Sequence, residues 1–269
     1  MINKLHQNKR YKYFRRVLKA LINDFKFPDK KEVLVFLLVP LCLSCIHYFG
    51  EASFTISFLR NIGLESFADQ LNDFCFYGPN PELNRLMFWV IILDTFYFLV
   101  PLLFIRFVLK AKPADFGLRL GFEKGGWKLY LLMLCFMIPL VLYFSGTQSF
   151  QDRYPFYNIK QGELLWPNFW TWELFYFSQF FCLEFFFRGF MVNGLKNKLG
   201  IYSVFVMTIP YCMIHFGKPM PETIAAIVAG IVLGFLSFRN NSIFLGFFLH
   251  ISVALSMDLA ALWREGFFG

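Results

Sequence analysis

The chain has 269 residues, of which 57% are hydrophobic, 21% aromatic and only 16% charged, with a mean hydropathy of +0.51. Soluble domains carry about a quarter charged residues, so this composition excludes an ordinary soluble protein. The apolar segments are too long for barrel strands and predict an all-α, polytopic membrane helix bundle. The net charge of +8 does not indicate nucleic-acid binding, because Lys and Arg concentrate in the amino-terminal arm and in alternate loops, as membrane topology rules predict.

Residues 1–32 form a basic arm. It carries ten Lys or Arg residues and little acid. Its apolar residues recur at helical spacing: Phe14, Val17, Leu18, Leu21, Ile22 and Phe25. This pattern predicts an amphipathic helix on the anionic surface of the cytoplasmic leaflet, with a disordered basic arm as the alternative.

Seven apolar spans follow in a single transmembrane domain, residues 33–269. We predict them at about residues 32–50, 86–108, 129–145, 168–196, 201–216, 222–238 and 242–263. The connection at 51–85 is predicted to hold a short interfacial helix around Phe67, Leu71 and Phe74, and a polar, aromatic-rich loop is predicted at 146–167.

The basic loops fix the predicted orientation. Loops 110–128, 192–200 and 239–241 all carry Lys or Arg, and an inside amino terminus places all of them in the cytoplasm. The sequence therefore predicts a multi-pass protein of the plasma or inner membrane that contacts membrane lipids.

Within the fourth span, Glu184 and Arg188 stand in an almost unbroken apolar run. A lone charge in hydrocarbon costs several kcal/mol or more, so it needs a partner or a water-filled cavity. Residues four apart lie on one helical face, so the two form either an internal ion pair or a functional site.

Among the four histidines, His215 and His250 both lie in apolar spans of the carboxyl-terminal half. Helical rise puts Glu184 roughly 20 Å, His215 ~22 Å and His250 about 14 Å from the cytoplasmic turns. An intramembrane histidine usually makes an interhelical hydrogen bond. Two at a similar depth to a glutamate favour a shared site, because Glu and His activate water for hydrolysis or bind zinc.

Three segments resemble the signatures of the CPBP intramembrane proteases, which include CAAX prenyl endopeptidases and the bacterial Abi and bacteriocin-processing relatives. The segments are LEFFFRGF at 183–190, YCMIH at 211–215 and GIVLGFLSFRNNSIFLGFFLH at 230–250. The family pattern is Glu-Glu-x-x-x-Arg, Phe-x-x-x-His and His-x-x-x-Asn or Asp. The resemblance covers a core at about 168–263, in which Gly230 and Gly234 fit the close helix packing of the family.

The resemblance implies four site residues, Glu184, Arg188, His215 and His250. It implies that Glu184, held by Arg188, polarises a water with help from His215. His250 then stabilises the oxyanion, directly or through a metal. If zinc is bound, its ligands are Glu184, His215 and His250.

The chain departs from the family pattern at three positions. Leu183 replaces the first glutamate, Tyr211 the phenylalanine and Ala254 the Asn or Asp. The loss at position 183 is the serious one, because the first glutamate is usually assigned as the base. We expect Tyr211 to pack, with its hydroxyl near His215.

The expected function is therefore an intramembrane endopeptidase, and the expected partner is a peptide or lipidated-protein substrate, prenylated or of leader type. The alternative is a non-catalytic membrane scaffold, chaperone or immunity protein that keeps the fold, with Glu184–Arg188 as a structural ion pair. A third is a transporter that uses Asp94 in a proton pathway.

Two further acids have separate expectations. Asp258, two turns after His250, can stand in for the residue missing at Ala254, and Glu173 is expected near the outer interface. The Cys42-x-x-Cys45 spacing beside His47 is weak evidence for metal or redox chemistry.

Overall fold

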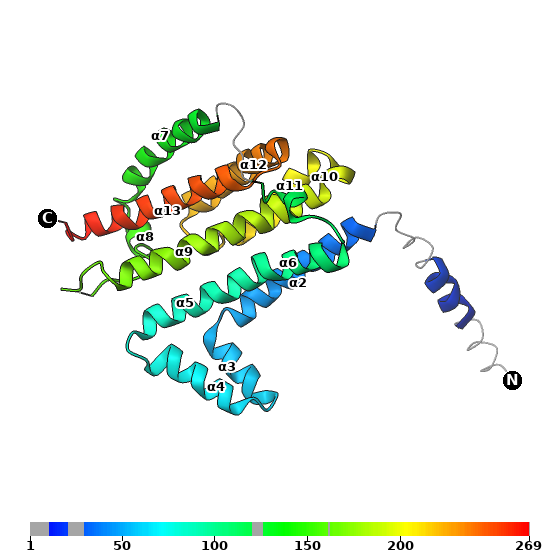
Figure 1. Ribbon diagram of the computed structural model, residues 1–269, viewed down its shortest axis with the longest axis horizontal. Coiled ribbons are helices and arrows are strands. Elements are labelled where there is room, and N and C mark those ends of the chain that lie inside the picture. Colours follow the sequence, from blue (N-terminus) through cyan, green and yellow to red (C-terminus); the bar gives the residue numbers. More distant parts are fainter. Residues whose placement is uncertain (1–10, 21–29, 120–125, 161, 269) are drawn as a thin grey trace.

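A computed structural model describes residues 11–20, 30–119, 126–160 and 162–268. These residues form helices, turns and loops without a strand, so the predicted all-α class is confirmed. Figure 1 shows the long helices lying side by side in one bundle, with the shorter α3 and α4 at one end.

The α-helices, with their bounds, are α2 (Lys30–Phe49), α3 (Ala52–Asn61), α4 (Glu65–Asn72), α5 (Pro81–Asp94), α6 (Val100–Leu103), α7 (Gly126–Phe144), α8 (Gln148–Gln151), α9 (Asn168–Glu184), α10 (Gly194–Leu199), α11 (Tyr202–Met213), α12 (Met220–Asn240) and α13 (Phe244–Arg264). π-Helical turns at Asp73–Tyr77, Thr95–Leu99, Phe104–Val108 and Phe185–Asn193 join or extend several of them, and a 3₁₀ turn covers Pro113–Phe116.

Each predicted span corresponds to one helical segment. Five are long and apolar enough to cross a membrane: Lys30–Phe49, Pro81–Val108, Gly126–Phe144, Met220–Asn240 and Phe244–Arg264. The fourth segment runs without a break from α9 to α10, and the fifth, α11, has only 12 residues. The chain is thus an integral, multi-pass membrane protein with a helical bundle.

Two connections differ from the prediction. The segment at 51–85 holds α3 as well as the predicted α4, because Thr55 Oγ1 donates to the carbonyl of Phe49 and starts a new helix directly after α2. The fifth span ends at Met213 rather than Phe216, so His215 lies in the turn beyond α11.

Three predicted basic loops meet at one end of the bundle (Figure 1). The amide of Ile243 donates to the carbonyl of Gly117 at 3.2 Å, and Ser242 Oγ donates to the carbonyl of Arg119 at 3.0 Å. Lys196 Nζ donates to Asn241 Oδ1 at 2.8 Å. These contacts join the loops after α6, α10 and α12 on a single side, as the predicted topology requires.

A helix covers residues 11–20 of the amino-terminal arm. Its apolar side chains Phe14, Val17 and Leu18 are exposed. The other residues of the predicted amphipathic pattern, Leu21, Ile22 and Phe25, lie outside the described residues.

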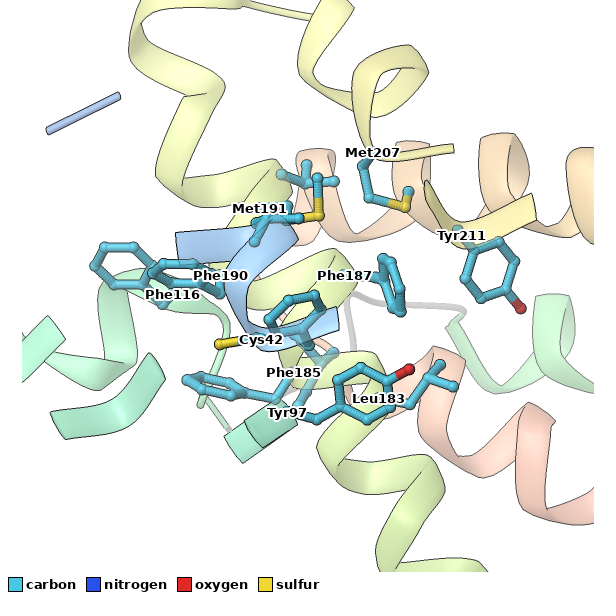
Figure 2. Close-up of a cluster of buried hydrophobic side chains, with 14 of the residues drawn as sticks. Cys42, Tyr97, Phe116, Leu183, Phe185, Phe187, Phe190, Met191, Met207 and Tyr211 are labelled. Atoms are coloured by element: carbon cyan, nitrogen blue, oxygen red, sulfur yellow. The ribbon is translucent and has the colours of Figure 1, made fainter. Parts of the chain in front are cut away.

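The main core surrounds the π-helical segment that continues α9. Phe185, Phe187 and Phe190 are fully buried against Tyr97 and Phe116, which come from the second span and the following loop (Figure 2). Gly189 permits this approach, since a Cβ there would collide with the carbonyl oxygen of Phe116. Because lipid supplies no hydrophobic driving force between helices, such close packing holds the bundle together.

Candidate functional site

Glu184 is the last residue of α9, and Arg188 lies one turn further, within the π-helical segment. Long π-helical stretches are rare and are often found at functional sites. Both side chains are 0% exposed, and Arg188 Nη1 lies 3.1 Å from Glu184 Oε1. The predicted pairing of these two residues is present in the structure.

His250, on α13, meets the same carboxylate oxygen. Its Nδ1 lies 2.7 Å from Glu184 Oε1, and its ring stacks on Phe180 with centroids 5.2 Å apart. The side chain keeps 18% of its surface exposed, so it forms the open edge of the site. Neither His250 nor Arg188 is aligned with Oε1 as a full hydrogen bond, an alignment that commonly tightens only when a substrate binds.

His215 reaches the site indirectly. Its Nδ1 lies 2.8 Å from the backbone carbonyl oxygen of Tyr211, and the two rings contact edge to face with centroids 4.9 Å apart. Since α11 ends at Met213, the His215 backbone has left the helix, and Thr223 Oγ1 donates to its carbonyl at 2.9 Å. The structure thus brings Glu184, Arg188 and His250 together, with His215 behind Tyr211.

Tyr211 is the residue that the sequence reasoning missed. Its hydroxyl lies 3.0 Å from His250 Nε2, a contact that was not expected, and the guanidinium carbon of Arg188 lies 3.9 Å from the centroid of its ring. A tyrosine where relatives have phenylalanine was the available signal, because the added hydroxyl needs a polar partner once buried.

The two other departures from the family pattern bring no polar group. Leu183 and Ala254 are both buried, Leu183 in the main aromatic core and Ala254 in a second cluster that contains Trp172 and Tyr176. Glu184 is therefore the carboxylate that the first motif contributes.

Glu184 lines a small cavity between α12 and α13, and its second oxygen, Oε2, is the atom of its carboxylate nearest Gly246, which lines the same cavity. The cavity measures ≈ 10 Å³ and is lined by Glu184, Ser237, Gly246 and, toward the loop end, Asn240 and Ser242. A cavity needs a volume of about 10–15 Å³ to hold one water molecule, so this cavity is about the size of one water. Among the described residues, no side chain donates to Oε2, and Gly246 leaves room for it, because a Cβ there would collide with that atom.

The predicted zinc ligands do not form a three-ligand set. Among the residues the structure describes, no group of three or more His, Cys, Asp or Glu side chains is arranged to hold a metal. A tetrahedral zinc separates a nitrogen and an oxygen ligand by about 3.4 Å. Glu184 Oε1 and His250 Nδ1 are already at 2.7 Å, with Arg188 beside them. Zinc remains a prediction from the resemblance.

Asp94 has an interhelical partner. Its Oδ2 accepts a hydrogen bond of 2.7 Å from Ser178 Oγ, which joins the second span to α9. This contact accounts for one oxygen of the carboxyl, and the other, Oδ1, is buried without a hydrogen-bond partner among the described residues.

Glu173 and Asp258 form a second acidic pair, between α9 and α13. Both are 0% exposed, so Glu173 does not extend its side chain to the outside of the bundle. The two carboxyls face each other, and the amide of Phe156 donates to Asp258 Oδ1 at 3.4 Å.

The cysteines supply no further chemistry. All six cysteines lie among the described residues and are free thiols, with Cys42 buried and Cys45 half-buried.

Fold and site together define a polytopic membrane protein with a buried Glu–Arg pair, a histidine and a tyrosine at the meeting point of three helices. Residues 165–256, which include all four predicted site residues, match the family model described as type II CAAX prenyl endopeptidase Rce1-like. The resemblance to the CPBP family is thereby confirmed over these residues. No curated protein and no solved structure matches the chain significantly.

Proposed function

We propose that this protein is an intramembrane endopeptidase that hydrolyses a peptide bond of a membrane-associated, lipidated substrate, with Glu184 as the base. The observation that carries the proposal is the asymmetry of the Glu184 carboxylate. Oε1 contacts Arg188 and His250, whereas Oε2 lies toward Gly246, which lines a cavity of the size of one water together with Glu184. A carboxylate held in this way can accept a proton only at the oxygen that faces the water.

The reaction needs few groups. Glu184 Oε2 takes one proton from the water, and the water oxygen attacks the carbonyl carbon of the substrate. The carbon–nitrogen bond then breaks, and the proton on Glu184 passes to the leaving amine. Arg188 and His250 hold the carboxylate in place during both transfers. Because both ring nitrogens of His250 already have contacts, we assign it this orienting role in place of the predicted oxyanion role.

The cavity also suggests the direction of entry. Asn240 and Ser242 line it at the end of the bundle where the basic loops meet. We propose that this end is cytoplasmic, with the amino terminus on the same side and the exposed apolar face of residues 11–20 on the leaflet surface. A substrate carrying a lipid anchor in that leaflet then presents its peptide at the correct depth.

The test is cleavage of a farnesylated CAAX peptide by purified, reconstituted protein. We expect Glu184→Gln to lower kcat at least roughly 10²-fold, the usual value of a general base. Glu173→Gln is the matched control, because it removes another fully buried carboxylate from the same helix, away from the cavity. Equal activity of wild-type protein and Glu184→Gln would reject the proposal.

The second candidate is the non-catalytic relative. The observation that favours it is the complete burial of the ion pair, together with the apolar residue at Leu183. On this hypothesis Glu184→Gln abolishes folding rather than cleavage, and the wild-type protein leaves the peptide intact. Thermal unfolding of the same variants separates the two candidates.

A further inference from the structure

Tyr211 contacts three of the predicted site residues. Its hydroxyl contacts His250, its ring lies beneath the Arg188 guanidinium, and its backbone carbonyl contacts His215. Figure 2 shows the ring at the border of the aromatic core, with the hydroxyl pointing away from the neighbouring Phe187 and Met207. The residue is fully buried, so this hydroxyl has to find its partner inside the protein.

The contacts of His250 fix where its proton lies. Nδ1 lies 2.7 Å from a carboxylate oxygen that can only accept, so the proton is on Nδ1. In a neutral imidazole Nε2 is then the acceptor, and Tyr211 donates its hydroxyl proton to it at 3.0 Å. These two contacts assign the tautomer of His250 that carries its proton on Nδ1.

We propose that Tyr211 is a positioning residue that holds His250 in this tautomer and thereby keeps Oε1 of Glu184 occupied. The inference rests on the proposed function, since its consequence is that Oε2 alone acts as the base. Without the hydroxyl, His250 is free to place its proton on Nε2. Nδ1 would then direct a lone pair at the Glu184 carboxylate, and the two groups would move apart.

Gly230 supports the same arrangement. A Cβ at this position of α12 would lie 3.1 Å from Tyr211 Cδ1 and 3.0 Å from Thr208 Cγ2. The close approach of α12 to α11 therefore confines the phenol ring at Cδ1, and the Arg188 guanidinium packs on the same ring. The hydroxyl is held in the direction of His250 by packing as well as by its hydrogen bond.

Tyr211→Phe tests the proposal, because it removes one oxygen atom and leaves the ring in place. We expect kcat for the farnesylated CAAX peptide to fall roughly 10- to 100-fold with KM little changed, as for other groups that orient a functional histidine. Tyr97→Phe is the matched control: it is another buried tyrosine of the same aromatic core, packed against Phe186 and Phe187. It should retain wild-type kcat.

A spectroscopic measurement distinguishes positioning from a general structural role. Nitrogen-15 NMR of histidine-labelled, reconstituted protein, with His250→Gln for assignment, reports which ring nitrogen of His250 carries the proton. We expect the Nδ1–H form in the wild type and in Tyr97→Phe, and a shift toward Nε2–H in Tyr211→Phe. An unchanged tautomer in Tyr211→Phe overturns the inference, as does unchanged kcat.

The two proposals fail in different ways. If Glu184→Gln still cleaves the peptide, the endopeptidase proposal is wrong whatever the tautomer of His250. If Glu184→Gln is inactive but Tyr211→Phe matches the wild type in kcat and tautomer, only the role of Tyr211 is wrong. Should the wild type leave the peptide uncleaved, the NMR comparison still decides whether Tyr211 sets the tautomer.

Discussion

Gly246→Ala provides a test of the site that leaves every polar residue in place. The new Cβ would collide with Glu184 Oε2 and lie 2.9 Å from Glu184 Cδ. Carbon atoms in contact are normally about 3.5–4.0 Å apart, so the carboxyl group must move by roughly 0.6–1 Å. A shift of that size away from α13 weakens the 2.7 Å contact with His250, and the new methyl group occupies space at the cavity that Glu184 and Gly246 line.

The expected magnitude follows from that displacement. A misplacement of about 1 Å costs on the order of 10²-fold in rate, whereas overpacking by one methyl costs about 1–3 kcal/mol of stability. The assay is peptide cleavage under saturating substrate, with thermal unfolding measured on the same samples. Gly234→Ala is the matched control, because its Cβ meets Met207 Cε and Val204 Cγ1 at 2.8 Å, away from Glu184. If Gly246→Ala retains wild-type kcat, Glu184 does not act as the base in this position.

Two other predictions use the same protein. Arg188→Met should destabilise the fold by about 3–5 kcal/mol, because it leaves Glu184 charged and buried without its cation. Glu184→Gln in the same chain should restore most of that lost stability. Thermal unfolding of the single and double variants measures both effects, and additive losses of stability would contradict a direct ion pair. Treatment with 1,10-phenanthroline should leave cleavage unchanged, because the ligand set for zinc is not assembled among the described residues; inhibition that added zinc reverses would instead support the metal-dependent mechanism.

The sequence predicted the elements of the site better than their contacts. Spacing alone placed Glu184 and Arg188 on one helical face, and depth in the bundle placed His250 near them. The sequence does not determine which histidine contacts the Glu184 carboxylate, because tertiary packing sets the rotation of α11 and α13 about their axes. The depth estimate for His215 also assumed a continuous helix, whereas α11 ends two residues before it.

The proximity of Glu173 and Asp258 could have been predicted from their sequence spacing relative to Glu184 and His250. α9 and α13 run in opposite directions, and Glu184 pairs with His250 across them. From that contact, Glu173 lies about 16 Å back along α9 and Asp258 about 12 Å forward along α13. Each is on the same helical face as its partner in the site, so antiparallel packing brings them together. Once the contact between Glu184 and His250 is known, the positions of Glu173 and Asp258 on the facing sides of α9 and α13 predict that these two acids lie close together in the interior.

A structural ion pair alone does not account for the surroundings of Glu184. Arg188 by itself would neutralise the carboxylate, and the apolar core around the following helical segment would exclude water. Instead the same carboxylate meets His250, His250 meets Tyr211, and a glycine on α13 keeps space open at the second oxygen. Each of these adds polar groups or empty volume to a membrane interior, where both are destabilising. Their common effect is to distinguish the two oxygens of one carboxylate, and a general base benefits from that asymmetry whereas an ion pair does not.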